Sequence, residues 1–204
     1  MKLSRSYGFF AVGALAVLLV TVSCGPGDAA GDAAAAGEQY EELTFEVNEE
    51  LLREESSIGS LGVSYRVPEG WVELDDEQLE LFGAQVYPLL HGDNGESLLR
   101  LHLDPTSGAL YVLSSLDVVA EETAEAALER HEASGYDPEY TVFRKDDFVV
   151  RQILFQAGNT VVFRLFFAAD GLEHDFEASF LIPRGNYEAI ARVIESAIGA
   201  IQVG

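Results

Sequence analysis

The sequence is poor in cysteine and in positive charge. Its 204 residues include one cysteine, Cys24, so no internal disulfide can form and a disulfide-stapled scaffold is excluded. Lys and Arg number 12 against 35 Asp and Glu, which gives a formal net charge of −23. Because proteins bind nucleic acids mainly through clustered Lys and Arg, this balance argues against a nucleic-acid partner.

The sequence also lacks the motifs of several enzyme classes. It contains no G-x-S-x-G nucleophile elbow, no glycine-rich phosphate loop and no His-Glu-x-x-His pattern. The acidic runs at residues 49–50, 54–55, 75–77 and 121–122 do not match a calcium loop, and we interpret them as a solvated acidic face. We therefore expect no catalytic residue, no metal site and no cofactor, and we favour a protein that is not an enzyme.

The individual histidines and serines have simple structural interpretations. None of the histidines has a recognised zinc spacing; they are His91, His102, His131 and His174. His91 and His102 would face each other across a predicted hairpin, near Asp93, where a metal is conceivable but solvent-facing histidines are favoured. His131 is expected to be a packing residue on a helix. The serines of interest are interpreted as strand or loop residues; they are Ser56, Ser57, Ser114 and Ser115.

The first 23 residues have the pattern of a signal peptide. Lys2 and Arg5 provide a positive start, and residues 9–22 form an uncharged run of 14 residues that is almost entirely apolar. Such a run is short for a membrane span but suits the apolar core of a signal peptide. A plain signal peptide and a membrane-anchoring helix remain as alternatives to the lipoprotein signal that the next residues indicate.

The four residues Thr21-Val22-Ser23-Cys24 resemble the lipobox of bacterial lipoproteins. The resemblance implies that the Cys24 thiol receives diacylglycerol, that cleavage falls between Ser23 and Cys24, and that the new amine is then acylated, with palmitate a typical chain. Two or three chains give stable anchoring. We expect a bacterial cell envelope protein on the outer side of the cytoplasmic membrane or, since Gly25 follows the cysteine, in the outer membrane.

A low-complexity tether and one domain follow. Residues 24–38 comprise the lipidated cysteine and a Gly, Ala and Asp-rich segment that cannot form a core, and residues 39–204 are predicted to be a single domain. Loss of the signal peptide removes Lys2 and Arg5 and makes the net charge more negative, at −25. Because anionic lipids repel such a body, the acyl chains must hold it at the membrane. The scarcity of lysine resembles proteins from saline habitats, where salt screens this self-repulsion.

Alternation and turn signals predict strands in the first half of the domain. Residues 61–67 form a predicted strand that ends at a Pro-Glu-Gly turn, with Trp71 as a core anchor. Asp75 or Asp76 is expected to cap a short helix. Residues 85–91 and 97–103 flank an Asp-Asn-Gly turn and predict a hairpin, although one helix over residues 75–90 is an alternative. A further strand is predicted over residues 109–116.

The second half predicts two helices around a run of strands. Residues 121–134 have apolar side chains at helical spacing, and Asn186 is expected to cap a closing helix with an apolar stripe. Four antiparallel strands are predicted between them, over residues 140–144, 148–155, 160–167 and 173–181.

The segment Arg66-Val67-Pro68-Glu69-Gly70-Trp71 is similar to the P-x-G-W feature of the PsbP-like superfamily. The order of elements and the closing segment, residues 194–201, are similar as well. The resemblance implies an α+β fold, an antiparallel sheet with helices on both faces in an α/β/α sandwich. It implies no enzyme activity, because members serve as photosystem subunits, as a small-GTPase-binding factor and as envelope lipoproteins.

Three functional hypotheses remain open. The first is a lipid-anchored, non-catalytic binding or assembly module of the envelope, with a protein partner or a small ligand. The second is an envelope enzyme with carboxylate or metal chemistry in a cleft, and the third is a loose acidic ion-binding surface. Convergent Asp, Glu and His side chains in one pocket would favour the second hypothesis.

Overall fold

The structure is a computed structural model that describes residues 40–75, 77–78, 89–90 and 97–204. All described elements belong to one compact unit, Glu38–Gly204. Across these described ranges, none of the helices combines the length and the apolar character that a membrane crossing requires.

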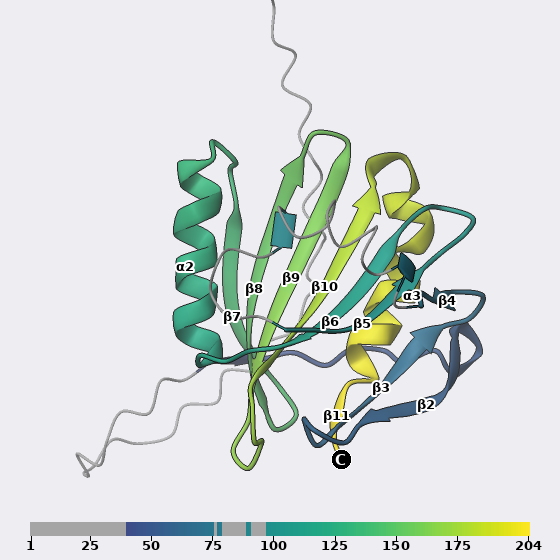
Figure 1. The fold of residues 1–204 in the computed structure, drawn as a ribbon, viewed down its shortest axis with the longest axis horizontal. Coiled ribbons are helices and arrows are strands. Elements are labelled where there is room, and N and C mark those ends of the chain that lie inside the picture. The colour runs from purple at the N-terminus through teal and green to yellow at the C-terminus, as the bar shows by residue number, and fades with distance from the viewer. Residues whose placement is uncertain (1–39, 76, 79–88, 91–96) are drawn as a thin grey trace, which may run out of the picture. The chain divides into compact units, whose positions relative to one another are not determined.

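The larger sheet of the described residues has eight strands in the order β1-β7-β8-β9-β10-β6-β5-β4 (Figure 1). Its strands are β1 (Glu41–Glu42), β4 (Val72–Glu73), β5 (Ser97–Leu103), β6 (Leu110–Ser115), β7 (Glu139–Lys145), β8 (Phe148–Ala157), β9 (Thr160–Ala168) and β10 (Phe176–Pro183). Neighbouring strands are antiparallel except β1 and β7, which pair in parallel through two residues each.

A smaller antiparallel sheet has the order β11-β3-β2. Its strands are β2 (Leu52–Ile58), β3 (Val63–Pro68) and β11 (Gln202–Val203). The helices whose bounds the structure describes are α2 (Ala120–Ala133), α3 (Tyr187–Gly199) and the 3-10 turns η1 (Glu49–Leu51) and η2 (Arg184–Asn186).

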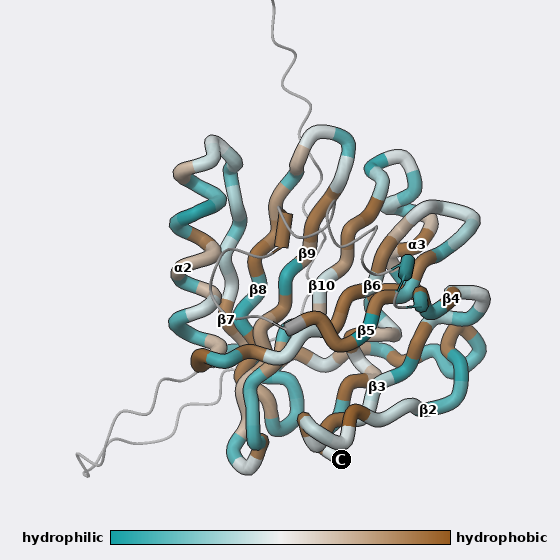
Figure 2. Tube along the Cα trace, viewed as in Figure 1, coloured by the Kyte–Doolittle hydropathy of each residue, from teal (hydrophilic) through white to brown (hydrophobic). Residues whose placement is uncertain are grey.

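Two hydrophobic cores lie on opposite faces of the larger sheet, because side chains alternate along its strands. On β6, Tyr111 and Leu113 belong to the core that contains α3 and the smaller sheet. Leu110 and Val112, between them in sequence, belong to the core that contains α2. Apolar residues accordingly follow the central strands, while turns are hydrophilic (Figure 2). The fold is α+β, with a helix on each face of a mainly antiparallel sheet, as the sequence predicts.

Most predicted elements are present with small shifts of their ends. The predictions over residues 61–67, 109–116, 121–134, 140–144, 148–155 and 160–167 correspond to β3, β6, α2, β7, β8 and β9. Trp71 is 4% exposed and lies in the core, as expected. The strand predicted over residues 173–181 begins only at Phe176, because Leu172 to His174 follow the Asp170-Gly171 turn.

The predicted hairpin is wrong where the structure describes it. Leu89 and Leu90 are helical instead of extended, and β5 pairs with β4 and β6. Leu90 is fully buried in the core on the α2 side, so apolar packing accounts for the hydrophobic residues that favoured a strand. The rest of the first hairpin strand and its Asp-Asn-Gly turn lie outside the described residues.

The two predicted helix caps have different outcomes. Asp75 Oδ1 accepts a hydrogen bond from Gln78 N at 2.9 Å, and Gln78 Oε1 accepts one from Asp75 N at 3.1 Å, which is a reciprocal capping box. Asn186 does not cap α3 with its side chain, because its backbone is helical and already part of η2. Its amide donates instead to the Ser107 carbonyl at 2.9 Å.

The end of α3 packs closely on the segment that follows β1. A Cβ at Gly199 would lie 2.8 Å from Val47 Cγ2 and 2.9 Å from Phe45 Cβ, so only glycine fits there without a shift of its neighbours. Asn48 N donates to Ser196 Oγ at 3.1 Å beside this contact. The segment that leaves β1 is therefore fixed against α3.

Candidate functional site

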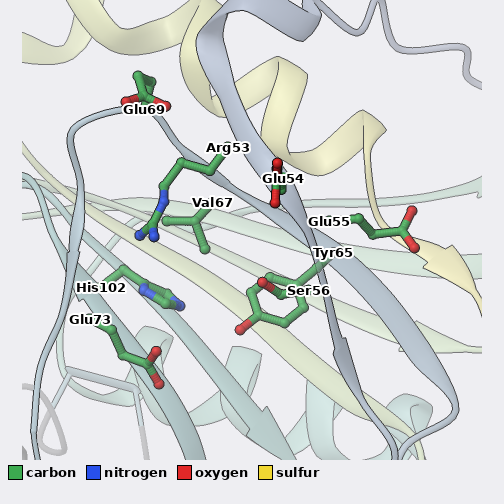
Figure 3. Close-up of a pocket in the computed structure, with 9 residues that line it drawn as sticks. All are labelled: Arg53, Glu54, Glu55, Ser56, Tyr65, Val67, Glu69, Glu73 and His102. Carbon is green, nitrogen blue, oxygen red and sulfur yellow. The ribbon is translucent and has the colours of Figure 1, made fainter.

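A cavity of about 420 Å³ lies between the two sheets. We call it the inter-sheet cavity, and its lining comes from four strands and one turn. The lining residues are Arg53, Glu54, Glu55 and Ser56 of β2, Tyr65 and Val67 of β3, Glu69 of the β3–β4 turn, Glu73 of β4 and His102 of β5 (Figure 3).

Strand register brings the inner residues together. Glu73 pairs with His102 between β4 and β5, and His102 pairs with Tyr111 between β5 and β6. Tyr65 and Val67 are alternate residues of β3, and both are buried against the larger sheet. Because each register fixes which side chains are neighbours, the sheet edge and β3 place an imidazole, a carboxylate and a phenol at one location.

His102 is the most unusual residue of the cavity. It is 2% exposed, and neither ring nitrogen has a hydrogen-bond partner among the described residues. Burial, together with the positive charges of Arg53 and Arg100, lowers the pKa of His102 to about 4. The imidazole is therefore neutral at pH 7 and offers one N–H donor and one nitrogen acceptor.

The prediction of a solvent-facing His102 is wrong. Along β5, Leu101 and Leu103 point to one face of the sheet, so the alternation predicts that His102 points to solvent. The opposite face is covered by the smaller sheet, and Tyr65 lies against the imidazole with ring centroids 6.1 Å apart. Both faces of β5 are therefore buried here, and the apolar–polar alternation of its sequence separates two buried faces and not a buried face from a solvent-exposed one.

Two tyrosines adjoin His102. Tyr111 is fully buried, stacks on Phe180 with centroids 4.5 Å apart, and its hydroxyl has no partner among the described residues. Burial raises the pKa of Tyr111 far above its usual value. Burial, aided by Glu73, also raises the pKa of Tyr65, so both phenols keep their protons at neutral pH.

The charged groups of the cavity are arranged in two zones. In Figure 3 the Arg53 guanidinium points toward His102, and the Glu73 carboxylate lies on the other side of the imidazole; we call this group the inner zone. The carboxylates of Glu54, Glu55 and Glu69 lie apart from it and form the outer zone, and all five charged residues are exposed. Arg53 Nη1 has a long contact of 3.5 Å with the Trp71 carbonyl, and Glu73 pairs with Arg100 at 3.2 Å.

A second polar cluster lies under α2, away from the cavity. Arg164 Nε and Nη2 each donate to one Glu177 carboxylate oxygen at 2.8 Å, and Ser179 Oγ donates to the same carboxylate. Arg164 is 0% exposed and Glu177 is 1% exposed. This arrangement compensates the cost of burying both charges, so we interpret it as structural.

His131 is a packing residue, as predicted. It is 4% exposed, and its ring lies 4.1 Å from that of Phe155. Its Nε2 lies 3.2 Å from Arg164 Nη1 and must accept, because a guanidinium only donates. Burial lowers the pKa of His131 to about 4, and the Arg164 and Arg130 charges act in the same direction.

The remaining predicted residues lie in other places. Ser23, Cys24, His91 and Asp93 are outside the described residues, so the lipidation site and the histidine pair stay predictions. Ser114 is buried in β6 and His174 is exposed in a turn. Within the described ranges, no three His, Cys, Asp or Glu side chains are grouped so that they could hold a metal ion.

A scan against known protein families and a search of curated proteins both find no match. Several solved structures are similar to this chain, and three of them are as follows. The solution structure of cyanobacterial PsbP (CyanoP) from Synechocystis sp. PCC 6803 has a TM-score of 0.45 and 9% identity, over 84% of this chain and 98% of that one. The Ran-binding protein Mog1p of Saccharomyces cerevisiae has a TM-score of 0.43 and 8% identity, over 74% and 94%. A structure from Bacteroides thetaiotaomicron VPI-5482 has a TM-score of 0.32 and 17% identity, over 70% and 45%.

The chain's own geometry defines its class. It is an α+β domain in which a large, mainly antiparallel sheet carries α2 on one face and α3 with a second sheet on the other. The two sheets enclose a polar cavity at the β5–β4 edge.

Proposed function

We propose that the chain is a lipid-anchored binding module of the bacterial cell envelope that takes up a small polar ligand in the inter-sheet cavity. Acyl chains on Cys24 would hold it at the membrane, and residues 25–37 would act as a flexible tether of roughly 20 Å r.m.s. length. An envelope protein that collects or delivers the ligand is the expected partner.

The observation that carries this proposal is the state of His102. Buried polar groups are almost always hydrogen-bonded, and an exception calls for an explanation. Both His102 nitrogens lack a partner within the described residues, and the ring lines a cavity large enough for a small molecule. Neighbouring atoms cover both ring nitrogens in this structure, so a ligand would reach them only when those side chains shift, and it would then accept from one nitrogen and donate to the other.

The anchor is tested with a Cys24→Ala variant of the full chain. Wild-type protein should begin at Cys24, incorporate labelled palmitate and sediment with membranes. The Cys24→Ala variant should remain an unprocessed and unlipidated precursor, whereas a control variant, Ser6→Ala, should mature normally. Normal processing and acylation of the Cys24→Ala variant would contradict the lipoprotein part of the proposal.

The binding function is tested on protein purified from its own envelope under native conditions. Denaturation of the wild-type protein should release a small molecule in stoichiometric amount, identified by mass spectrometry. Arg53→Ala should abolish this, because it removes the cation of the cavity. Arg192→Ala, an exposed position on α3, is the matched control. A ligand in this cavity would be contradicted if both variants release equal amounts of the small molecule. It would also be contradicted if the wild type releases none.

An envelope enzyme is the second candidate, and one observation favours it. Glu73 and His102 share the same cavity and the same strand pair, and carboxylate and imidazole groups are common acids and bases. Incubation of the released molecule with the protein distinguishes the candidates, because a binding module returns it unchanged. Chemical conversion that is lost in Glu73→Gln would establish the enzyme.

A further inference from the structure

The inner zone of the inter-sheet cavity is a set of hydrogen-bond donors with a positive charge. The Arg53 guanidinium points into it, the buried His102 supplies one N–H, and the protonated Tyr65 supplies one O–H. Guanidinium, imidazole and phenol groups that converge on one location match the two oxygens of a carboxylate, since charge-assisted hydrogen bonds to it are the strongest available. Arg53 is available for this because its side-chain hydrogen bond within the described residues is a long one, 3.5 Å, to the neutral Trp71 carbonyl.

The outer zone carries the opposite charge. Glu54, Glu55 and Glu69 are exposed, and none of them forms an ion pair with another described residue. Glu73, in the inner zone, forms an ion pair with Arg100. Both side chains are about half exposed (50% and 49%), so water screens this pair. A simple anion would therefore be attracted by Arg53 and repelled at the entrance, whereas a cation would be attracted to the entrance only.

We propose that the ligand of the inter-sheet cavity is a small zwitterion of the α-amino-acid class, with its carboxylate on Arg53, Tyr65 and His102 and its ammonium toward Glu73 and the outer zone. This inference rests on the proposed binding function and names its ligand class. A zwitterion is the simplest molecule that satisfies both zones at once, and the two charges of an α-amino acid are only a few ångströms apart.

The size of the cavity agrees with this class. About 420 Å³ lies within the usual range for small-molecule pockets and exceeds what the amino-acid backbone needs. The side chain would then lie along Val67 and the Tyr65 ring, the apolar part of the lining. Both residues are 3% exposed and belong to the core, so this wall is rigid.

Binding can be measured on the detergent-solubilised full chain. Each of the twenty L-amino acids is titrated separately by calorimetry, with the fluorescence of Trp71 as a second readout. Trp71 is the only tryptophan, and its carbonyl contacts Arg53. At least one amino acid should bind with 1:1 stoichiometry, whereas its amide and its N-acetyl derivative should each bind at least ~10-fold more weakly, because each lacks one charge.

Variants locate the binding in the cavity. Arg53→Ala and His102→Phe should weaken binding by roughly 10- to 100-fold, and Arg53→Lys should weaken it less. The control Arg192→Ala should bind like the wild type, and circular dichroism verifies that each variant is folded. Calorimetry of Glu73→Gln should show a larger loss for the amino acid than for its N-acetyl derivative.

The outcomes separate this inference from the function on which it rests. If none of the twenty amino acids binds, or if Arg53→Ala binds as well as the wild type, the zwitterion assignment is wrong. The binding function survives that result when native protein still releases another molecule in an Arg53-dependent manner. If no amino acid binds and native protein releases nothing, both the assignment and the binding function fail.

Discussion

Lys145 Nζ donates a hydrogen bond to the backbone carbonyl of Ile201, 2.7 Å away, although 56 residues separate them in the chain. The lysine is 2% exposed, and its amine also contacts the Asp146 carboxylate at 2.6 Å. The contact ties the end of β7 to the two-residue segment between α3 and β11. One of the two lysines of the sequence thus fixes the C-terminal segment to the larger sheet.

Lys145→Met should destabilise the protein by about 1–3 kcal/mol. The apolar side chain has a similar length, but it leaves the Ile201 carbonyl buried without its donor. Urea unfolding followed by circular dichroism measures the loss. Asp146→Asn is the control and should cost less than ~1 kcal/mol, because the Asp146 side chain is 69% exposed. Equal effects of the two substitutions would contradict this account.

Glu177→Gln should destabilise the protein by about 3–5 kcal/mol. It removes the carboxylate that accepts from two Arg164 nitrogens and leaves a guanidinium that is 0% exposed without its counter-charge. The matched control is Glu49→Gln, since Glu49 pairs with Arg66 at the surface and is 74% exposed. Its expected cost is below ~1 kcal/mol. Denaturation midpoints and slopes of both variants provide the comparison.

Acid should weaken the protein between about pH 6.5 and pH 4. Burial lowers the pKa of His102 and of His131 to about 4 in the folded protein, from 6.5 when exposed. Below pH 6.5 the unfolded chain therefore binds protons that the folded protein does not. This stabilising contribution is complete above pH 6.5 and falls by up to ~1.4 kcal/mol per pH unit for each histidine.

Variants attribute the acid response to these histidines. His131→Phe keeps the ring contacts but removes one titrating group, so the slope of unfolding free energy against pH should fall by up to ~1.4 kcal/mol per unit. His174→Phe, at an exposed turn position, is the control and should leave the slope unchanged. An unchanged slope in His131→Phe would show that this histidine titrates normally in the folded state.

Tyr111→Phe should leave the stability unchanged or raise it by up to about 1 kcal/mol. The substitution removes a hydroxyl that has no partner among the described residues and keeps the ring stacked on Phe180. Thermal unfolding in parallel with Tyr140→Phe, which changes an exposed phenol, measures the difference. A loss above 1 kcal/mol would mean that the Tyr111 hydroxyl has a partner in the folded protein.

The local patterns of the sequence predict most of the larger sheet. Strands β7, β8 and β9 alternate or run apolar between clear turns. Gly135 follows the C-terminal cap of α2 and has the positive φ of 82° that is typical there. β2 was not predicted, because its residues Leu52–Ile58 include five exposed positions in a row and no apolar alternation. It is extended because it pairs with β3 across a short turn, and its own residues carry no pattern that indicates this pairing.

The cavity could not be predicted from the sequence for a related reason. Arg53 lies in the unpredicted strand, and Glu73 lies in a strand of only two residues. The His102 pattern is the same whether its face meets water or another sheet, and only the tertiary structure decides between them. Tyr65 lies two residues before Val67 on a predicted strand, so its position predicts burial. Nothing in the sequence around it predicts a ligand-binding site.

The parallel pairing of β1 with β7 has a mechanical consequence for the proposed anchored protein. The tether precedes β1, which occupies the edge of the larger sheet opposite to β4 and the inter-sheet cavity. A pull from the membrane would load β1 first, and its two paired residues can peel from β7 without disturbing β4 or β5. The close packing of Phe45 and Val47 on Gly199 would then resist further unfolding from the N-terminal side. The proposed ligand would stay bound while the anchored end is under tension.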